Sequence, residues 1–234
     1  FQGDFTPSAE EWAQIATSGT IWLVVPLILG GAIVPIQIII TILLLRSGGG
    51  WSTAGSFVAG MASTRLVQGL AFGLLLSNGE TGGSAESGSG PVTSGILVAL
   101  GLLLFATALK QLVADEDPDA PPPKWITMTE TMSAGRAFVL GVGLIAIGPK
   151  FWVLTLSAIG AIGDAQLTRT AAILVFVAFV VLTAGLHLAV LTAAAVAPER
   201  SASLLDSAAD WLKAHNRWIV VVLGVVFGTW FLLK

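Results

Sequence analysis

The sequence predicts an all-α polytopic membrane protein whose six transmembrane helices form two inverted three-helix repeats. Composition predicts the class: 55% of the residues are hydrophobic, 11% are charged, and the mean hydropathy is +0.87, outside the range of ordinary soluble domains. Long apolar runs predict the helices, because each is close to the roughly 20 residues that a bilayer requires. A proline motif that occurs in both halves predicts the repeat.

The chain before the first apolar run, residues 1–19, is expected to hold a tag remnant and a short interfacial helix. Its first three residues are typical of the end of a protease-cleavable tag. Thr6, Pro7 and Glu10 then have the chemistry of a helix start, namely an oxygen cap, a first-turn proline and an acid at the positive end of the helix dipole.

Each half of the chain is expected to supply three spans. Residues 20–113 form the first repeat and residues 136–234 the second, with an acidic, proline-rich cytoplasmic linker at residues 114–135. An odd number of spans per half inverts the second half relative to the first. A Gly/Ser-rich stretch, residues 77–90, is too polar to pack and is expected to be a loop. The predicted spans lie near Thr20–Leu45, Trp51–Leu76, Val92–Val113, Arg136–Ile162, Thr168–Val196 and Arg217–Leu233.

The basic residues predict which side of this topology faces the cytoplasm. The side richer in lysine and arginine is assigned to the cytoplasm, so both termini are expected outside. Residues 201–215 have apolar positions at helical spacing and predict an amphipathic helix on the cytoplasmic surface. The richer side carries Arg46, Lys110, Lys124, Arg136, Arg200, Lys213 and Arg217, and the other carries Arg169 and Lys234.

The proline motif predicts that the first and fourth helices are broken. It occurs as Ala32-Ile33-Val34-Pro35 and again as Ala146-Ile147-Gly148-Pro149. A proline removes a backbone N–H, so in lipid it persists where protein or water satisfies the freed carbonyls. Broken helices at matching positions are typical of a transporter's binding site. The alternative is that each proline only shapes its own helix.

The ionisable and amide side chains inside the predicted spans are basic or neutral. All 14 acidic residues lie outside the spans, which argues against a metal-ion exporter and against a carboxylate proton relay. Cysteine is absent, so thiolate metal sites are excluded, and neither a metal nor a cofactor is expected. The sequence has no catalytic triad, phosphate-binding loop or nucleic-acid-binding module, so neither catalysis nor nucleic-acid binding is expected.

Arg65 and Lys150 are the strongest candidates for substrate binding, because a cation at mid-bilayer needs carbonyls, water or an anionic ligand. Arg65, with Gln68 one turn onward, suits a phosphate, sulfate or carboxylate group. The alternative is that Arg65 reaches lipid head groups along its own stem. Lys150 directly follows the second break and predicts a second anion site, unless it extends to the cytoplasmic surface.

Gln37 and His187 complete the candidate site. Gln37 lies two residues after Pro35 and either lines the same cavity or forms a helix–helix hydrogen bond. His187 either carries a proton for coupling near neutral pH or is a hydrogen-bonded packing residue.

Three short motifs occur in order along the chain: Gly30–Ile36, Gly148-Pro149-Lys150 and Asp210–Asn216. Together they resemble the peptidoglycolipid-addressing protein family of the lysine exporter superfamily, and the resemblance runs from Ile21 to the end. It implies a bacterial plasma-membrane protein that helps to move envelope glycolipids toward the cell surface. It also places substrate-binding roles on Gly31, Pro35, Gly148, Pro149 and Lys150. Where this chain has Gly148 the family usually has asparagine, so one amide ligand is missing.

The leading hypothesis is therefore a transporter or flippase-like factor for an anionic, lipid-linked substrate. One alternative is export of a small metabolite such as an amino acid, and another is a non-transporting membrane assembly subunit. The expected partners are a lipid or glycolipid substrate and the bilayer, with either a second copy of the chain or a larger envelope-lipid export machinery.

Overall fold

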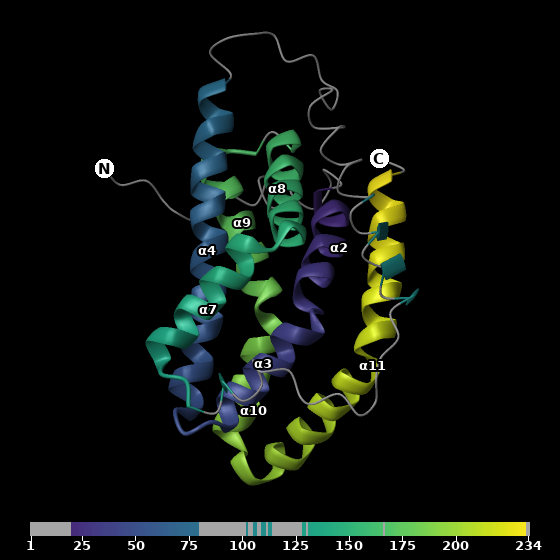
Figure 1. Cartoon of the computed structure of the whole chain (residues 1–234). Helices are drawn as coiled ribbons and strands as arrows, with labels where there is room; N and C mark the ends of the chain where they lie inside the picture. Colours follow the sequence, from purple (N-terminus) through teal and green to yellow (C-terminus); the bar gives the residue numbers. More distant parts are fainter. Residues whose placement is uncertain are drawn as a thin grey trace, which may run out of the picture.

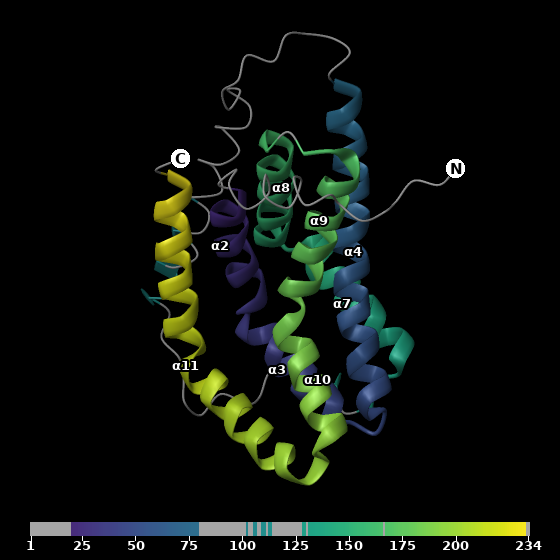
Figure 2. The same ribbon diagram turned by 180° about the vertical axis from the view of Figure 1, so that it is seen from behind.

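The computed structural model describes residues 20–79, 102, 105, 106, 109, 110, 112, 113, 128, 129, 131–165 and 167–232. Within them the chain is helical, without strands, and the helices form an upright bundle (Figures 1 and 2). The predictions for residues 1–19 and for most of the third span and of the linker lie outside the described residues. The helices are α2 Thr20–Ala32, α3 Pro35–Arg46, α4 Gly50–Gly79, α7 Ala134–Ile147, α8 Pro149–Asp164, α9 Arg169–Thr183, α10 Gly185–Val196 and α11 Pro198–Leu232.

Three pairs of helices are separated by sharp bends. Among the described residues no single helix is long and apolar enough to cross a membrane, but the pairs α2–α3, α7–α8 and α9–α10 could do so by length and composition. They bend by 48°, 73° and 55° respectively. New helices begin at Pro35 and Pro149, so the two predicted breaks are confirmed. The third break, at Ala184, is one that the proline motif does not predict.

Two helices differ from their predicted bounds. α4 continues to Gly79, so the first residues of the expected Gly/Ser-rich loop are helical. The predicted surface helix over residues 201–215 is not separate from the last span, because α11 runs without interruption from Pro198 to Leu232. The residues that join the two parts, His215 and Asn216, include neither proline nor glycine, so nothing there ends the helix.

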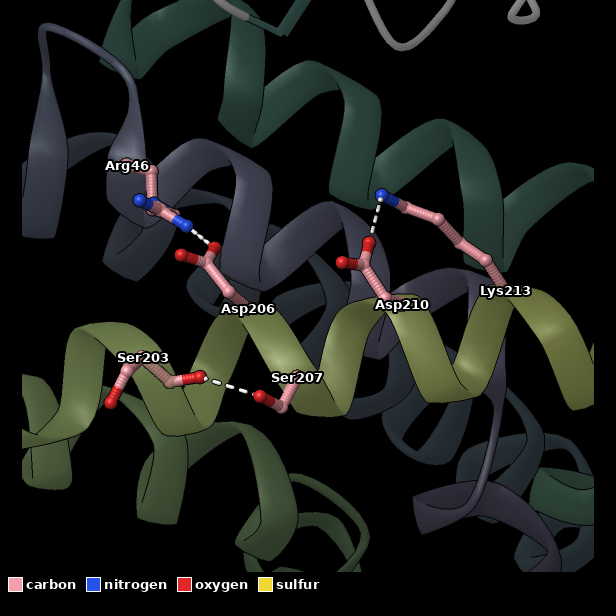
Figure 3. A network of polar contacts seen from close by, with 6 residues as sticks. All are labelled: Arg46, Ser203, Asp206, Ser207, Asp210 and Lys213. Atoms are coloured by element: carbon pink, nitrogen blue, oxygen red, sulfur yellow. Dashed lines mark hydrogen bonds and ion pairs between the residues drawn. The ribbon is translucent and has the colours of Figure 1, made fainter.

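The first part of α11 packs against α3. Leu205, Ala209 and Leu212 are buried in one apolar cluster with Ile38 and Ile42. Next to this cluster, Asp206 pairs with Arg46 at the end of α3, and Lys213 donates to Asp210 at 3.1 Å (Figure 3). Both ion pairs are largely solvent-accessible and contribute little to stability, so the apolar contacts hold this part of α11 in place.

The two halves meet where α4 crosses α7. A Cβ atom on Gly60 would strike the carbonyl oxygen of Phe138, and a Cβ atom on Gly141 would strike that of Phe57. The two backbones are therefore in direct contact through reciprocal glycines, a packing mode that membrane helices use widely. This crossing holds α7, and with it the second break, against the first half.

Candidate functional site

The three breaks share one buried core. Val34 and Gly148, which precede α3 and α8, have extended backbones with φ/ψ of -112°/102° and -78°/109°. Ala184 precedes α10 with φ/ψ of -83°/-5°. Val34, Ala184 and Phe151, which lies one turn into α8, belong to the same apolar cluster. The breaks are thus brought together in the interior, although they are far apart in the sequence.

Two local features favour a bend at the third break. The Thr183 hydroxyl donates to the carbonyl of Phe179 four residues earlier, a bond that tends to bend helices. Gly185 follows, and glycine is among the weakest helix formers. The same threonine–glycine spacing occurs at Thr53 and Gly55 inside the unbroken helix α4, so these features alone do not predict the break.

Polar side chains gather beside the breaks. We call the following set the break cluster; its members are at most 3% exposed and come from α3, α4, α9 and α10: Gln37, Thr41, Arg65, Gln68, Thr183 and His187. A Cβ atom built on Gly31 would lie 3.6 Å from Nη2 of Arg65 and would strike the Thr183 side chain. Arg65 therefore lies against the end of α2, between the first and third breaks.

Thr41 connects α3 with α10. Its hydroxyl donates to the Gln37 carbonyl at 2.9 Å and lies 2.9 Å from Nδ1 of His187. Because the single hydroxyl hydrogen is used by the carbonyl, the hydrogen-bond pattern assigns a hydrogen to Nδ1 and leaves a lone pair on Nε2. His187 also lies within electrostatic range of Arg65. The ring is thus held in one orientation with an acceptor nitrogen free.

Most side-chain polar atoms of the break cluster have no hydrogen-bond partner among the described residues. These atoms are Nε and Nη2 of Arg65, both amide atoms of Gln37 and of Gln68, and Nε2 of His187. The ion pairs within the described part of the chain join Arg46 with Asp206 and Lys213 with Asp210, so Arg65 has no carboxylate there. A buried guanidinium without a counter-charge is costly, and an anion with several acceptor oxygens would satisfy its free N–H groups.

The remaining predicted residues lie at the second break. Lys150 is half-buried, and its Nζ lies 4.9 Å from the centroid of the Phe151 ring, in cation–π range. Pro149 is exposed, whereas Pro35 is buried. The structure thus brings Gly31, Gln37, Gln68 and His187 to the region of Arg65, but among the described contacts none joins Lys150 to Arg65.

Gly148 is explained by close packing at the second break. A Cβ atom there would lie 2.9 Å from the carbonyl oxygen of Leu144 and 2.7 Å from Cδ2 of Phe151. A larger residue would push Phe151 out of the core that the three breaks share. The glycine at this position therefore avoids a clash between a side chain and either Phe151 or the Leu144 carbonyl.

Replacing Thr41 with valine should lower the free energy of unfolding by about 1–3 kcal/mol, because the buried Nδ1 of His187 loses its partner. Thermal unfolding in detergent measures the effect. Thr192 is the matched control. Its hydroxyl also donates to the carbonyl four residues earlier, that of Leu188 at 2.8 Å, but this hydrogen bond is exposed. Thr192→Val should change stability by less than about 0.5 kcal/mol. Equal losses in the two variants would contradict the role of the Thr41–His187 contact.

Comparison with known families adds a separate observation. A family model described as Sap, sulfolipid-1-addressing protein, matches residues 24–234. The matched range contains the three breaks and every member of the break cluster. No curated protein and no solved structure matches the chain.

Proposed function

The chain belongs to the family described as sulfolipid-1-addressing proteins, and from this premise we propose that it binds an anionic lipid-linked substrate at Arg65 and moves it toward the cell surface. The family description agrees with the lipid-addressing role expected from the sequence motifs, although the lipid in its name is a sulfolipid. Membership of the lysine exporter superfamily remains part of the proposal.

The observation that carries the proposal is the Arg65 guanidinium, which is 2% exposed and whose Nε and Nη2 atoms have no partner among the described residues. A sulfate group has one negative charge and several acceptor oxygens, which suits the paired N–H donors of arginine. The amides of Gln37 and Gln68 are additional donors, and both are buried and have no partner among the described residues.

The proposed movement uses the bent helices. Broken helices around a buried site are the elements that rock in secondary transporters, and α2–α3 and α7–α8 are both broken. We assign Lys150 to a second substrate contact along the path and His187 to proton coupling through its free Nε2. A second copy of the chain or a larger export machinery would complete the path across the envelope.

The proposed orientation places the lower end of Figure 1 in the cytoplasm of a bacterium. α3 ends and α7 begins at this end, so it carries Arg46 and Arg136, whereas α9 begins at the opposite end with Arg169 (Figures 1 and 2). This distribution follows the positive-inside rule and would place both termini outside the plasma membrane.

The test compares two lipids that differ in one group, a sulfated galactosylceramide and galactosylceramide itself. The purified protein is incubated with both lipids, and native mass spectrometry measures which one it retains. We expect at least about tenfold preference for the sulfated lipid, equivalent to about 1.4 kcal/mol. Equal retention would contradict the proposal, and uptake of a free amino acid by reconstituted vesicles would support the alternative of small-metabolite export.

A further inference from the structure

An apolar groove of about 400 Å³ runs between α4 and the bent pair α9–α10. Small residues of α4, namely Gly55, Ala59 and Ala62, form its floor, and larger ones such as Leu66, Val181 and Leu188 form its edges. The lining extends from Trp51 to Leu66 on α4, which corresponds to about 22 Å of helix. Its volume is typical of a ligand site, and its shape is long and narrow rather than round.

One end of the groove lining is at Trp51. Trp51 lies at the start of α4, and its indole N–H donates to the Leu191 carbonyl of α10 at 3.1 Å. Tryptophan often lies at the interface between membrane and water, so this end corresponds to the edge of the hydrocarbon layer. From there the groove follows α4 toward the level of Arg65.

The groove and the break cluster share their walls. Ala62 and Leu66 line the groove and lie on either side of Arg65 in the sequence, and Val180 and Ala184 line it and flank Thr183 in the same way. Arg65 and the groove therefore lie along the same stretch of α4, and Thr183 and the groove lie at the same bend between α9 and α10.

We propose that the groove holds one acyl chain of the lipid whose head group binds Arg65, an inference that rests on the proposed function. The edges carry exposed apolar side chains on α9–α10, a pair that could cross a membrane by length and composition, so its open side faces hydrocarbon. In a bilayer no hydrophobic force closes a gap between helices that is lined with small residues. An acyl chain has the shape and the apolarity to fill it.

The test uses the same pair of galactosylceramides, each with a photoactivatable diazirine in its acyl chain, in liposomes that contain the full chain. After illumination, mass spectrometry of peptides locates the labelled residues. We expect the label of both lipids to concentrate on residues that line the groove. An even spread over exposed apolar residues of all helices would overturn the inference, and so would cross-links that show a second copy of the chain in the groove.

Two variants with the same substitution provide the control. Ala59 is exposed on the groove floor, so Ala59→Phe fills the groove without entering the core, and it should reduce the groove label about tenfold. Ala178 is exposed on α9 outside the lining, and Ala178→Phe should leave the label unchanged. Equal loss in both would overturn the inference.

An Arg65→Gln variant separates this inference from the proposed function. It should lose the preference for the sulfated lipid but keep the groove label of the unsulfated one. If Arg65→Gln still preferred the sulfated lipid, the proposed function alone would be refuted. If the wild type preferred the sulfated lipid but the label lay outside the groove, the acyl site alone would be refuted.

Discussion

Replacement of Arg65 with methionine should abolish the preference for the sulfated lipid and at the same time raise the thermal stability of the protein. The binding loss follows from the removal of a buried charge that pairs with the ligand, which costs about 2–5 kcal/mol, or about 30-fold or more in affinity. The stability gain follows because Arg65 is buried and without a carboxylate partner among the described residues. Replacing buried charges by apolar side chains of similar volume is neutral or stabilising by about 1–4 kcal/mol.

Thermal unfolding in detergent and the two-lipid retention assay measure both effects on the same preparation. Arg136→Met is the matched control, because Arg136 is exposed in the first turn of α7, and this variant should behave as the wild type in both assays. A drop in stability for Arg65→Met, together with unchanged lipid preference, would show that Arg65 has a structural role only. A substitution that raises stability and lowers lipid binding is expected at a residue that is retained for function.

Gly141→Ala should lower the free energy of unfolding by about 1–3 kcal/mol, the cost typical of overpacking a tight contact. The added Cβ would strike the Phe57 carbonyl and would lie 3.1 Å from the Met61 nitrogen, so the backbones of α4 and α7 would have to separate. Neither partner atom belongs to a flexible side chain, and therefore no small rearrangement relieves the overlap.

Gly143→Ala is the control for this prediction. Gly143 lies two residues further along the same helix, and a Cβ atom there would meet nothing within 4 Å. Alanine is a better helix former than glycine by about 1 kcal/mol, so this variant should be as stable as the wild type or more so. Thermal unfolding that ranks the two variants in the reverse order would contradict the close crossing of α4 and α7.

The glycines illustrate how far the sequence reaches. Gly60, Gly69, Gly73, Gly141 and Gly143 are equally small, and the sequence predicts only that helices can approach one another at such residues. In the structure Gly60 and Gly141 face opposing backbones and Gly69 faces the Phe176 ring, whereas Gly73 and Gly143 face open space. Whether a glycine can be replaced depends on which atoms of the neighbouring helix it faces. The sequence around the glycine does not specify those atoms.

By itself the sequence determined the features that arise from local chemistry. Pro35 and Pro149 break their helices through their own rings, and Arg65 in an apolar run without acids predicts a buried cation. Only the tertiary structure decided that His187 meets Thr41, 146 residues away in the sequence, that the third break lies beside Arg65, and that Lys150 packs on Phe151 instead. The reason is physical: a proline ring or a buried charge acts where it stands, whereas a contact between helices depends on how distant segments pack.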